Sequence, residues 1–253
     1  MGLFNSSNPA LSENTLKNIS VAYDGQTMTI NGTIWKTVFG VLLTLAGGFY
    51  VVYAVMQNPA ILNTLFLIGI IGGLIAAIVT IVKPQVARFT MPLYALLEGL
   101  VLGAASLAIP AYFGAEVSVV VPQAVLGTVV TFLVMLFLYR TGVIKVTQTF
   151  MSVVIAATFG IAAVYLILFI MSLFGGTNFL MGTSALSIGV TAFAALVAAL
   201  NLAMGFELIN QMEQRGAPKY MEWYGAFSIL VTLVWLYLEL LRLFAKLSSN
   251  NRN

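Results

Sequence analysis

Four charged residues interrupt the long apolar runs of this 253-residue chain, and their chemistry is the most informative feature of the sequence. Glu98 lies midway along one run, Glu207 near the end of another, and Glu239 and Arg242 in the last one. A charged side chain at the centre of a bilayer costs about 2.5–3.5 kcal/mol on insertion scales, so such residues usually face a bundle interior. They mark ion paths, proton relays or charge pairs. These four are therefore the candidate residues of an ion path or gate.

Each candidate also has a purely structural explanation. Glu239 and Arg242 are three residues apart, share a helical face and could neutralise each other. Glu98 could be a protonated acid bonded to a neighbouring carbonyl, and Glu207 could extend to water at the membrane interface. For each of these residues, the functional and the structural explanation both remain open at this point.

Two carboxyl groups in one buried site would behave differently. They cannot both ionise cheaply, so they hold one proton between them as a latch. Loss of that proton as the pH rises would separate them and leave oxygen ligands that suit Ca²⁺. Glu207 and Glu239 are the possible calcium ligands, and Arg242 would repel cations from them.

The composition excludes most other classes of protein. Hydrophobic residues make up 60% of the chain and charged residues 8%, too few to cover the surface of a soluble globule. This rules out a soluble enzyme, a disordered chain and a nucleic-acid binder, and leaves an all-α integral membrane protein. Because Cys and His are both absent, disulfides, thiolate and imidazole metal sites and Ser–His hydrolysis are excluded. No cofactor is expected.

Seven apolar runs are long enough to cross a bilayer as helices. They comprise Thr37–Met56, Ile61–Val82, Met91–Ile109, Val119–Tyr139, Phe150–Phe174, Ser184–Ile209 and Tyr224–Phe244. We therefore expect a polar N-terminal tail over residues 1–33, a single membrane domain over 34–246, and a polar C-terminal tail over 247–253. Gly99, Gly103, Ala104 and Ala105 form a stripe of small residues, which predicts close helix packing rather than a pore lining.

Basic residues are distributed unevenly among the connections between these runs. The connections at 57–60, 110–118 and 175–183 contain none, whereas those on the other side contain Lys17, Lys36, Lys83, Arg88, Arg140, Lys145, Arg215 and Lys219. The positive-inside rule then places the N-terminus in the cytoplasm. An odd number of crossings puts the C-terminus outside, unless the last run is re-entrant.

Several segments resemble the Bax inhibitor family of transmembrane proteins, in its bacterial branch. The most specific is GAPKYMEWYGAF at 216–227, which continues into WLYLELLR at 235–242; PLYALLEG at 92–99, LYRTG at 138–142 and SNP at 7–9 also agree. The resemblance implies seven helices, with two three-helix layers around a central C-terminal helix. It also implies a slow, pH-sensitive calcium leak, here across a bacterial inner (plasma) membrane.

In that family two Asp residues, on helices six and seven, share a proton and close the pore. The resemblance places Glu239 at the helix-seven position, but the helix-six position falls at Gly205, which has no carboxylate. Glu207 is two residues further on, a rotation of roughly 200° around the helix. The resemblance therefore implies the fold while leaving this gate in question.

Two functions of different classes follow. The first is a cation-leak channel, with calcium as the transported ion and the bilayer as its surroundings. The alternative is a regulatory protein that binds or inhibits a membrane protease or another membrane complex, in which case the buried acids are structural. Proton-coupled transport of a small solute also stays open. An intramembrane enzyme is not expected, because the chain has no G-x-G-D motif and no nucleophile–base set.

Overall fold

The computed structural model describes residues 26–175 and 179–250, and these contain seven long helices. Every one of the seven is long and apolar enough to cross a membrane, as predicted. The helices are α2 (Ile30–Gln57), α3 (Ile61–Val82), α4 (Ala87–Tyr112), α5 (Val117–Arg140), α6 (Gln148–Leu173), α7 (Ala185–Gln214) and α8 (Met221–Asn250). Two short 3₁₀ turns, Pro84–Val86 and Phe179–Met181, precede α4 and α7.

The helix ends follow from local chemistry. Hydroxyl side chains cap three N-termini: Thr29 accepts from the amide of Gly32, Thr147 from that of Phe150, and Ser184 from that of Ser187. Four of the connections contain a glycine with φ between 65° and 77°, a conformation that other residues rarely adopt. These glycines are Gly114, Gly142, Gly175 and Gly216.

Several helices extend beyond the apolar runs that predicted them. α2 begins at Ile30, inside the expected tail, and α8 continues to Asn250, inside the expected C-terminal tail. α4 continues past Pro110 to Tyr112. The hydrogen-bond ladder of a helix does not need apolar side chains, so a helix can continue past the hydrocarbon slab that the apolar run measures. Because α8 is one unbroken helix, it has no reversal of the kind that a re-entrant segment requires.

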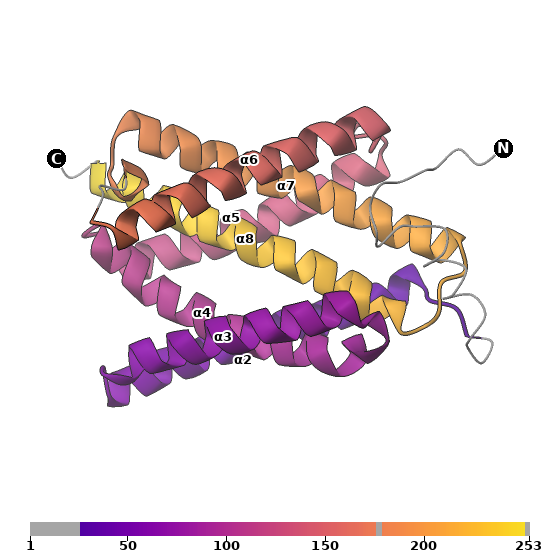
Figure 1. The fold of residues 1–253 in the computed structure, drawn as a ribbon, viewed down its shortest axis with the longest axis horizontal. Helices are drawn as coiled ribbons and strands as arrows, with labels where there is room; N and C mark the ends of the chain where they lie inside the picture. Colours follow the sequence, from indigo (N-terminus) through magenta and orange to yellow (C-terminus); the bar gives the residue numbers. More distant parts are fainter. Residues whose placement is uncertain (1–25, 176–178, 251–253) are drawn as a thin grey trace.

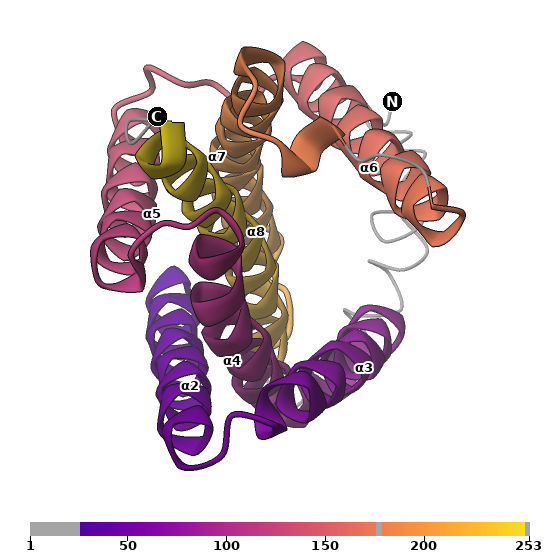
Figure 2. The ribbon, with the colours of Figure 1, turned by 90° about the vertical axis from the view of Figure 1, so that its left-hand side faces the viewer.

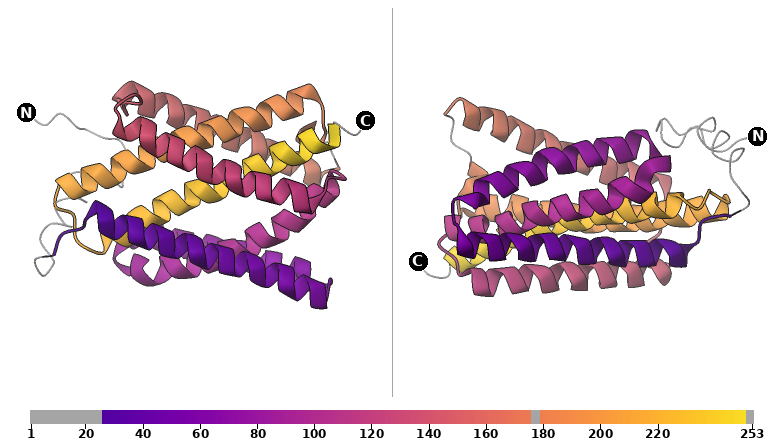
Figure 3. Two further views of the ribbon diagram at one scale, coloured as in Figure 1. Left: turned by 180° about the vertical axis from the view of Figure 1, so that it is seen from behind. Right: turned by 90° about the horizontal axis from the view of Figure 1, so that it is seen from below.

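α8 lies at the centre of the molecule. In Figure 1 it runs diagonally between a layer formed by α2, α3 and α4 and a layer formed by α5, α6 and α7. The view along the bundle in Figure 2 shows the other helices arranged around it, and both views in Figure 3 agree. The expected two-layer architecture around the C-terminal helix is therefore confirmed.

Polar side chains join α8 to four of its neighbours. Glu222 forms an ion pair with Lys36 of α2, and Tyr237 shares a 2.7 Å hydrogen bond with Ser106 of α4. Glu239 accepts from Tyr165 of α6, and the Lys246 ammonium donates to the hydroxyl of Thr191 of α7 at 2.7 Å. α5 packs against α8 through apolar contacts, with Leu240 and Phe244 lying against Gly127. α8 is thus the element to which both layers attach.

The stripe of small residues in α4 packs tightly against α2. A Cβ atom at Gly99 would overlap the carbonyl oxygen of Thr44 and lie 2.9 Å from the Cα atom of Gly47. One at Gly103 would lie 2.7 Å from the carbonyl oxygen of Gly48. Only glycine permits this approach of two backbones. The prediction that the stripe serves close packing is confirmed.

Candidate functional site

Glu239 lies in a fully buried, polar environment in the half of α8 nearer its C-terminus. Its carboxylate accepts from the Tyr165 hydroxyl at 2.9 and 3.0 Å and from the indole of Trp235 at 3.1 Å. The Arg242 guanidinium lies 3.3 Å away, and it also lies over the ring of Tyr165, 5.2 Å from its centroid. Every one of these partners is a hydrogen-bond donor or a cation, so each offers a proton or a positive charge to the oxygens of Glu239.

The charges around Glu239 are predominantly positive. Arg242 and Lys246 both follow it on α8, within two helical turns, and α6 contributes only the Tyr165 hydroxyl to the carboxylate. At this level α7 presents apolar side chains, among them Ala194 and Val197. Lys246 is 1% exposed and has neutral partners, the Thr191 hydroxyl and, at 2.9 Å, that of Ser187. This part of the interior therefore holds two cations for one carboxylate.

Glu207 is half-buried where α7 faces α5. It accepts from the Tyr139 hydroxyl of α5 and from the Gln211 amide one turn later, both at 2.7 Å. The ring of Tyr139 in turn packs on Phe206. Glu207 therefore links α5 to α7, and its carboxylate has neutral hydrogen-bond partners.

Glu98 is half-buried in the wall of a cavity of about 580 Å³. Tyr94, one turn earlier on α4, interacts with the Glu98 carboxyl group through its hydroxyl. On the α3 side the carboxyl lies against Gly73, where an added Cβ would be 3.3 Å from Oε1. Glu98 is the one carboxyl group among the described lining residues.

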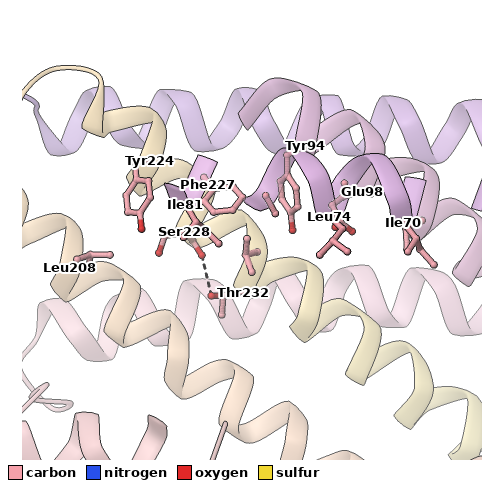
Figure 4. Close-up of a pocket in the computed structure, with 14 residues that line it drawn as sticks. Ile70, Leu74, Ile81, Tyr94, Glu98, Leu208, Tyr224, Phe227, Ser228 and Thr232 are labelled. Carbon is pink, nitrogen blue, oxygen red and sulfur yellow. Dashed lines mark hydrogen bonds between the residues drawn. The ribbon is translucent and has the colours of Figure 1, made fainter. Parts of the chain in front are cut away.

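Residues from four helices line this cavity. Figure 4 shows Tyr94 and Glu98 of α4 beside Tyr224, Phe227, Ser228 and Thr232 of α8, with Leu208 of α7 opposite. The wall contributed by α3 is apolar and includes Ile70, Leu74 and Ile81. The cavity is thus mostly apolar, with a few hydroxyl groups and a single acid.

The packing of the helices separates the three candidate acids. Gly205 lies against Ile229 and Ile209 against Gly225, which places Glu207 level with about residue 227 of α8. Glu239 is twelve residues further along α8, roughly 18 Å at 1.5 Å per residue. On α4, Tyr94 packs on Phe227 of α8, and Ser106 shares a hydrogen bond with Tyr237 of α8. Glu98 lies between these two contacts, level with about residue 231 of α8. It is therefore roughly 12 Å from Glu239, measured along the axis of α8.

The structure therefore brings together one pair among the predicted site residues, Glu239 with Arg242. Among the described residues no hydrogen bond joins Glu98, Glu207 and Glu239 to one another. Glu239 therefore has no partner carboxyl with which to share a proton here; its described partners are Arg242, Tyr165 and Trp235. Gly205 likewise faces Ile229, ten residues from Glu239, so a carboxylate at position 205 would not reach it.

The described residues contain no group of three or more acidic side chains that could hold a metal ion. Glu207 and Glu239, the possible calcium ligands, lie on different helices at different depths, each with its own partners. Calcium binding at these two residues stays a prediction.

Two buried charged residues near the ends of α8, Glu222 and Lys246, were not among the predicted site residues. Glu222, 1% exposed, accepts from the amide and the hydroxyl of Thr29 and forms the ion pair with Lys36. Met28 is buried against the α7–α8 connection, where its amide donates to the carbonyl of Ala217 at 2.8 Å. Glu222 lies within the segment at 216–227 that resembles the Bax inhibitor family, and this resemblance was the sequence feature that could have identified it. No sequence pattern singled out Lys246, the last residue of the expected membrane domain.

Residues 8–249 match the family model described as Bax inhibitor 1 like. No protein of curated function matches the chain.

Proposed function

The chain belongs to the Bax inhibitor 1 like family, and from this premise we propose that it is a slow, pH-sensitive cation-leak channel with calcium as the transported ion. The observation that carries the proposal is the cavity beside the central helix, with the Glu98 carboxyl in its wall. A carboxylate midway across the membrane provides a cation with an oxygen ligand where lipid offers none. Hydroxyl groups of Ser228 and Thr232 add further oxygen atoms.

In this proposal Glu239 is the gate residue. Its bonds to Tyr165 attach α6 to α8, while Arg242 and Lys246 keep the surroundings positive. A cation that approaches this region meets two positive charges against one negative charge, so the state described here resists cation flow. Opening requires that α6 separate from α8 at Tyr165.

The sign of the pH response follows from the partners of Glu239. All of them are hydrogen-bond donors or a cation, so a proton placed on Glu239 would weaken the ion pair with Arg242 and the hydrogen bond from Tyr165. Acidification then releases α6, and flux increases as the pH falls. This is opposite to the response expected of two carboxyl groups that share a proton.

We also propose the orientation that the basic residues indicate. The N-terminal ends of α2 and α8 lie at one end of the bundle, and the C-terminal end of α8 at the other (Figure 1). Lys36, Lys83, Arg140, Lys145 and Lys219 belong to the former end, which the positive-inside rule assigns to the cytoplasm. The protein is then a multi-pass component of the plasma membrane of a bacterium.

Calcium uptake into liposomes tests this function directly. Purified wild-type protein, Glu98→Gln and Glu116→Gln are reconstituted at equal amounts, and uptake is measured at two pH values. We expect wild-type flux to be higher at the lower pH, strongly reduced in Glu98→Gln, and unchanged in Glu116→Gln, whose carboxyl is exposed at the start of α5. Folded wild-type protein without flux at either pH would overturn the channel and leave regulation of a membrane complex as the function.

A further inference from the structure

The cavity beside Glu98 faces the lipid. Its α3 residues Ile70, Leu74 and Ile81 are 39%, 59% and 56% exposed on the surface that hydrocarbon covers. Val231, on the central helix, is 38% exposed at the same place. A molecule dissolved in the bilayer can therefore reach the central helix from the side, without passing through either aqueous face.

The polar groups of the cavity select one kind of ligand. Among its described lining residues none is basic, so the Glu98 carboxyl faces the cavity without a cation of the protein beside it. The hydroxyl groups of Tyr94 and Tyr224 point in the same direction in Figure 4, and Tyr94 interacts with the carboxyl group. Apart from the hydroxyls of Ser228 and Thr232, the remaining wall is apolar. The cavity has a volume of about 580 Å³, which lies within the range of roughly 300–1,000 Å³ typical of binding sites for small organic ligands.

We propose that this cavity is a binding site for lipophilic amines, small molecules with an apolar body and one basic nitrogen that enter sideways from the bilayer. A neutral amine dissolves in the hydrocarbon. When the Glu98 carboxyl carries a proton, its O–H bond breaks on binding and an N–H bond forms on the amine. The products are a carboxylate and an ammonium ion in contact, which pair strongly in a medium of low dielectric constant.

Each part of the cavity has a role in this site. The ammonium ion bonds to the Glu98 carboxylate, beside which Tyr94 also lines the cavity. The apolar body of the ligand lies between α3 and Val231, in space that lipid tails otherwise occupy. An alcohol with the same apolar body can fill this space but cannot take the proton. The basic nitrogen is therefore the feature that the site recognises.

Equilibrium binding of 1-aminoadamantane and 1-adamantanol separates these contributions. Protein in lipid nanodiscs is dialysed against each compound, and uptake by empty nanodiscs is subtracted. We expect the wild-type protein to bind the amine, and to bind the alcohol far more weakly. Glu98→Gln should weaken binding of the amine by about tenfold or more, since one partner of a buried ion pair is lost. Glu116→Gln should bind like the wild type.

A second variant tests the location of the site while leaving Glu98 in place. Val231→Phe fills part of the cavity from an exposed position, so the fold should tolerate it, and it should weaken binding of both compounds. Melting temperatures of all variants verify folding. Equal binding of amine and alcohol by the wild type, or undiminished binding of the amine by folded Glu98→Gln or Val231→Phe, would overturn the site. The measurement involves no ion flux, so its outcome is independent of the channel proposal.

Discussion

The two three-helix layers are held together by different kinds of contact. In the α2–α4 layer, glycine brings backbones into direct contact: Gly47 and Gly48 of α2 meet Gly99 and Gly103 of α4, and Gly69 of α3 meets the carbonyl of Leu97. In the α5–α7 layer, a Cβ added at Gly160 of α6 or at Gly189 of α7 would meet nothing within 4 Å.

Individual side-chain bonds take the place of backbone contact in the α5–α7 layer. Tyr139 donates to Glu207, the Asn201 amide donates to the Thr158 hydroxyl at 2.9 Å, and Tyr165 donates to Glu239 of α8. A layer of backbone contacts cannot move without losing many van der Waals contacts at once. A helix held by a few polar bonds can leave when one charge changes. The comparison therefore assigns rigidity to α2–α4 and movement to α6.

The largest expected effect is on the rigid layer. Gly99→Leu places a side chain where the carbonyl oxygen of Thr44 already lies, so we expect a loss of stability of about 3 kcal/mol. Thermal unfolding in detergent measures it. Gly160→Leu, on α6 with open space around it, is the matched control and should unfold near the wild-type temperature. Equal effects of the two substitutions would remove the distinction between the layers.

Glu239→Gln tests the polar attachment of α6. Loss of the carboxylate leaves Arg242 without its counter-charge, and we expect a cost of about 1–3 kcal/mol, because the guanidinium is partly exposed. Calcium flux should increase and lose most of its response to pH. Glu239→Gln combined with Arg242→Gln should recover the melting temperature, since no unpaired charge remains. Flux that keeps its full pH response in folded Glu239→Gln would contradict the role of Glu239 as gate.

Lys246→Met should have a smaller effect on stability. The buried ammonium has no acidic partner within bonding distance among the described residues, and methionine has a similar length without the cost of burying a charge. The free energy of unfolding should stay within about 1 kcal/mol of the wild-type value or rise. Flux should increase, because one of the two cations near Glu239 is gone. A severe loss of stability would show instead that the bonds to Ser187 and Thr191 contribute more to stability than burial of the charge costs.

Arg140→Gln is expected to have the smallest effect. Arg140 is exposed in the last turn of α5, where it can contact anionic lipid headgroups, an attraction of about 1 kcal/mol. The ratio of calcium to sodium flux in liposomes should match that of the wild type. A changed ratio would place Arg140 on the ion path and extend the functional region beyond the cavity.

The apolar runs predicted the number of helices and their order, and the resemblance to the Bax inhibitor family predicted the central position of α8. Apolar length and the positions of Gly and Pro determine where a chain can cross a bilayer, and these are local properties. The stripe at Gly99 and Gly103 was recognisable for the same reason, since small residues four apart share one helical face.

The partners of the acids could not be read in the same way. Whether Glu239 meets Glu207 or Tyr165 depends on the register between helices far apart in the chain, which hydropathy does not encode. Only the Glu239–Arg242 pair was visible, because its spacing of three residues is local. The cavity, formed by residues of α3, α4, α7 and α8, has no sequence signal of its own.

Distances between spin labels on the two layers test the central claim, that α6 moves while the α2–α4 layer stays fixed. The chain has no Cys, so pairs of introduced cysteines are the only attachment sites. Labels at Leu67→Cys and Leu166→Cys report the distance between α3 and α6. Labels at Leu42→Cys and Leu67→Cys report the distance between α2 and α3, within the rigid layer. All three positions are exposed. On acidification, the first pair should gain a population at longer distance while the second stays unchanged. Unchanged distances in the first pair while calcium flux responds to pH, or an equal change in both pairs, would contradict the account.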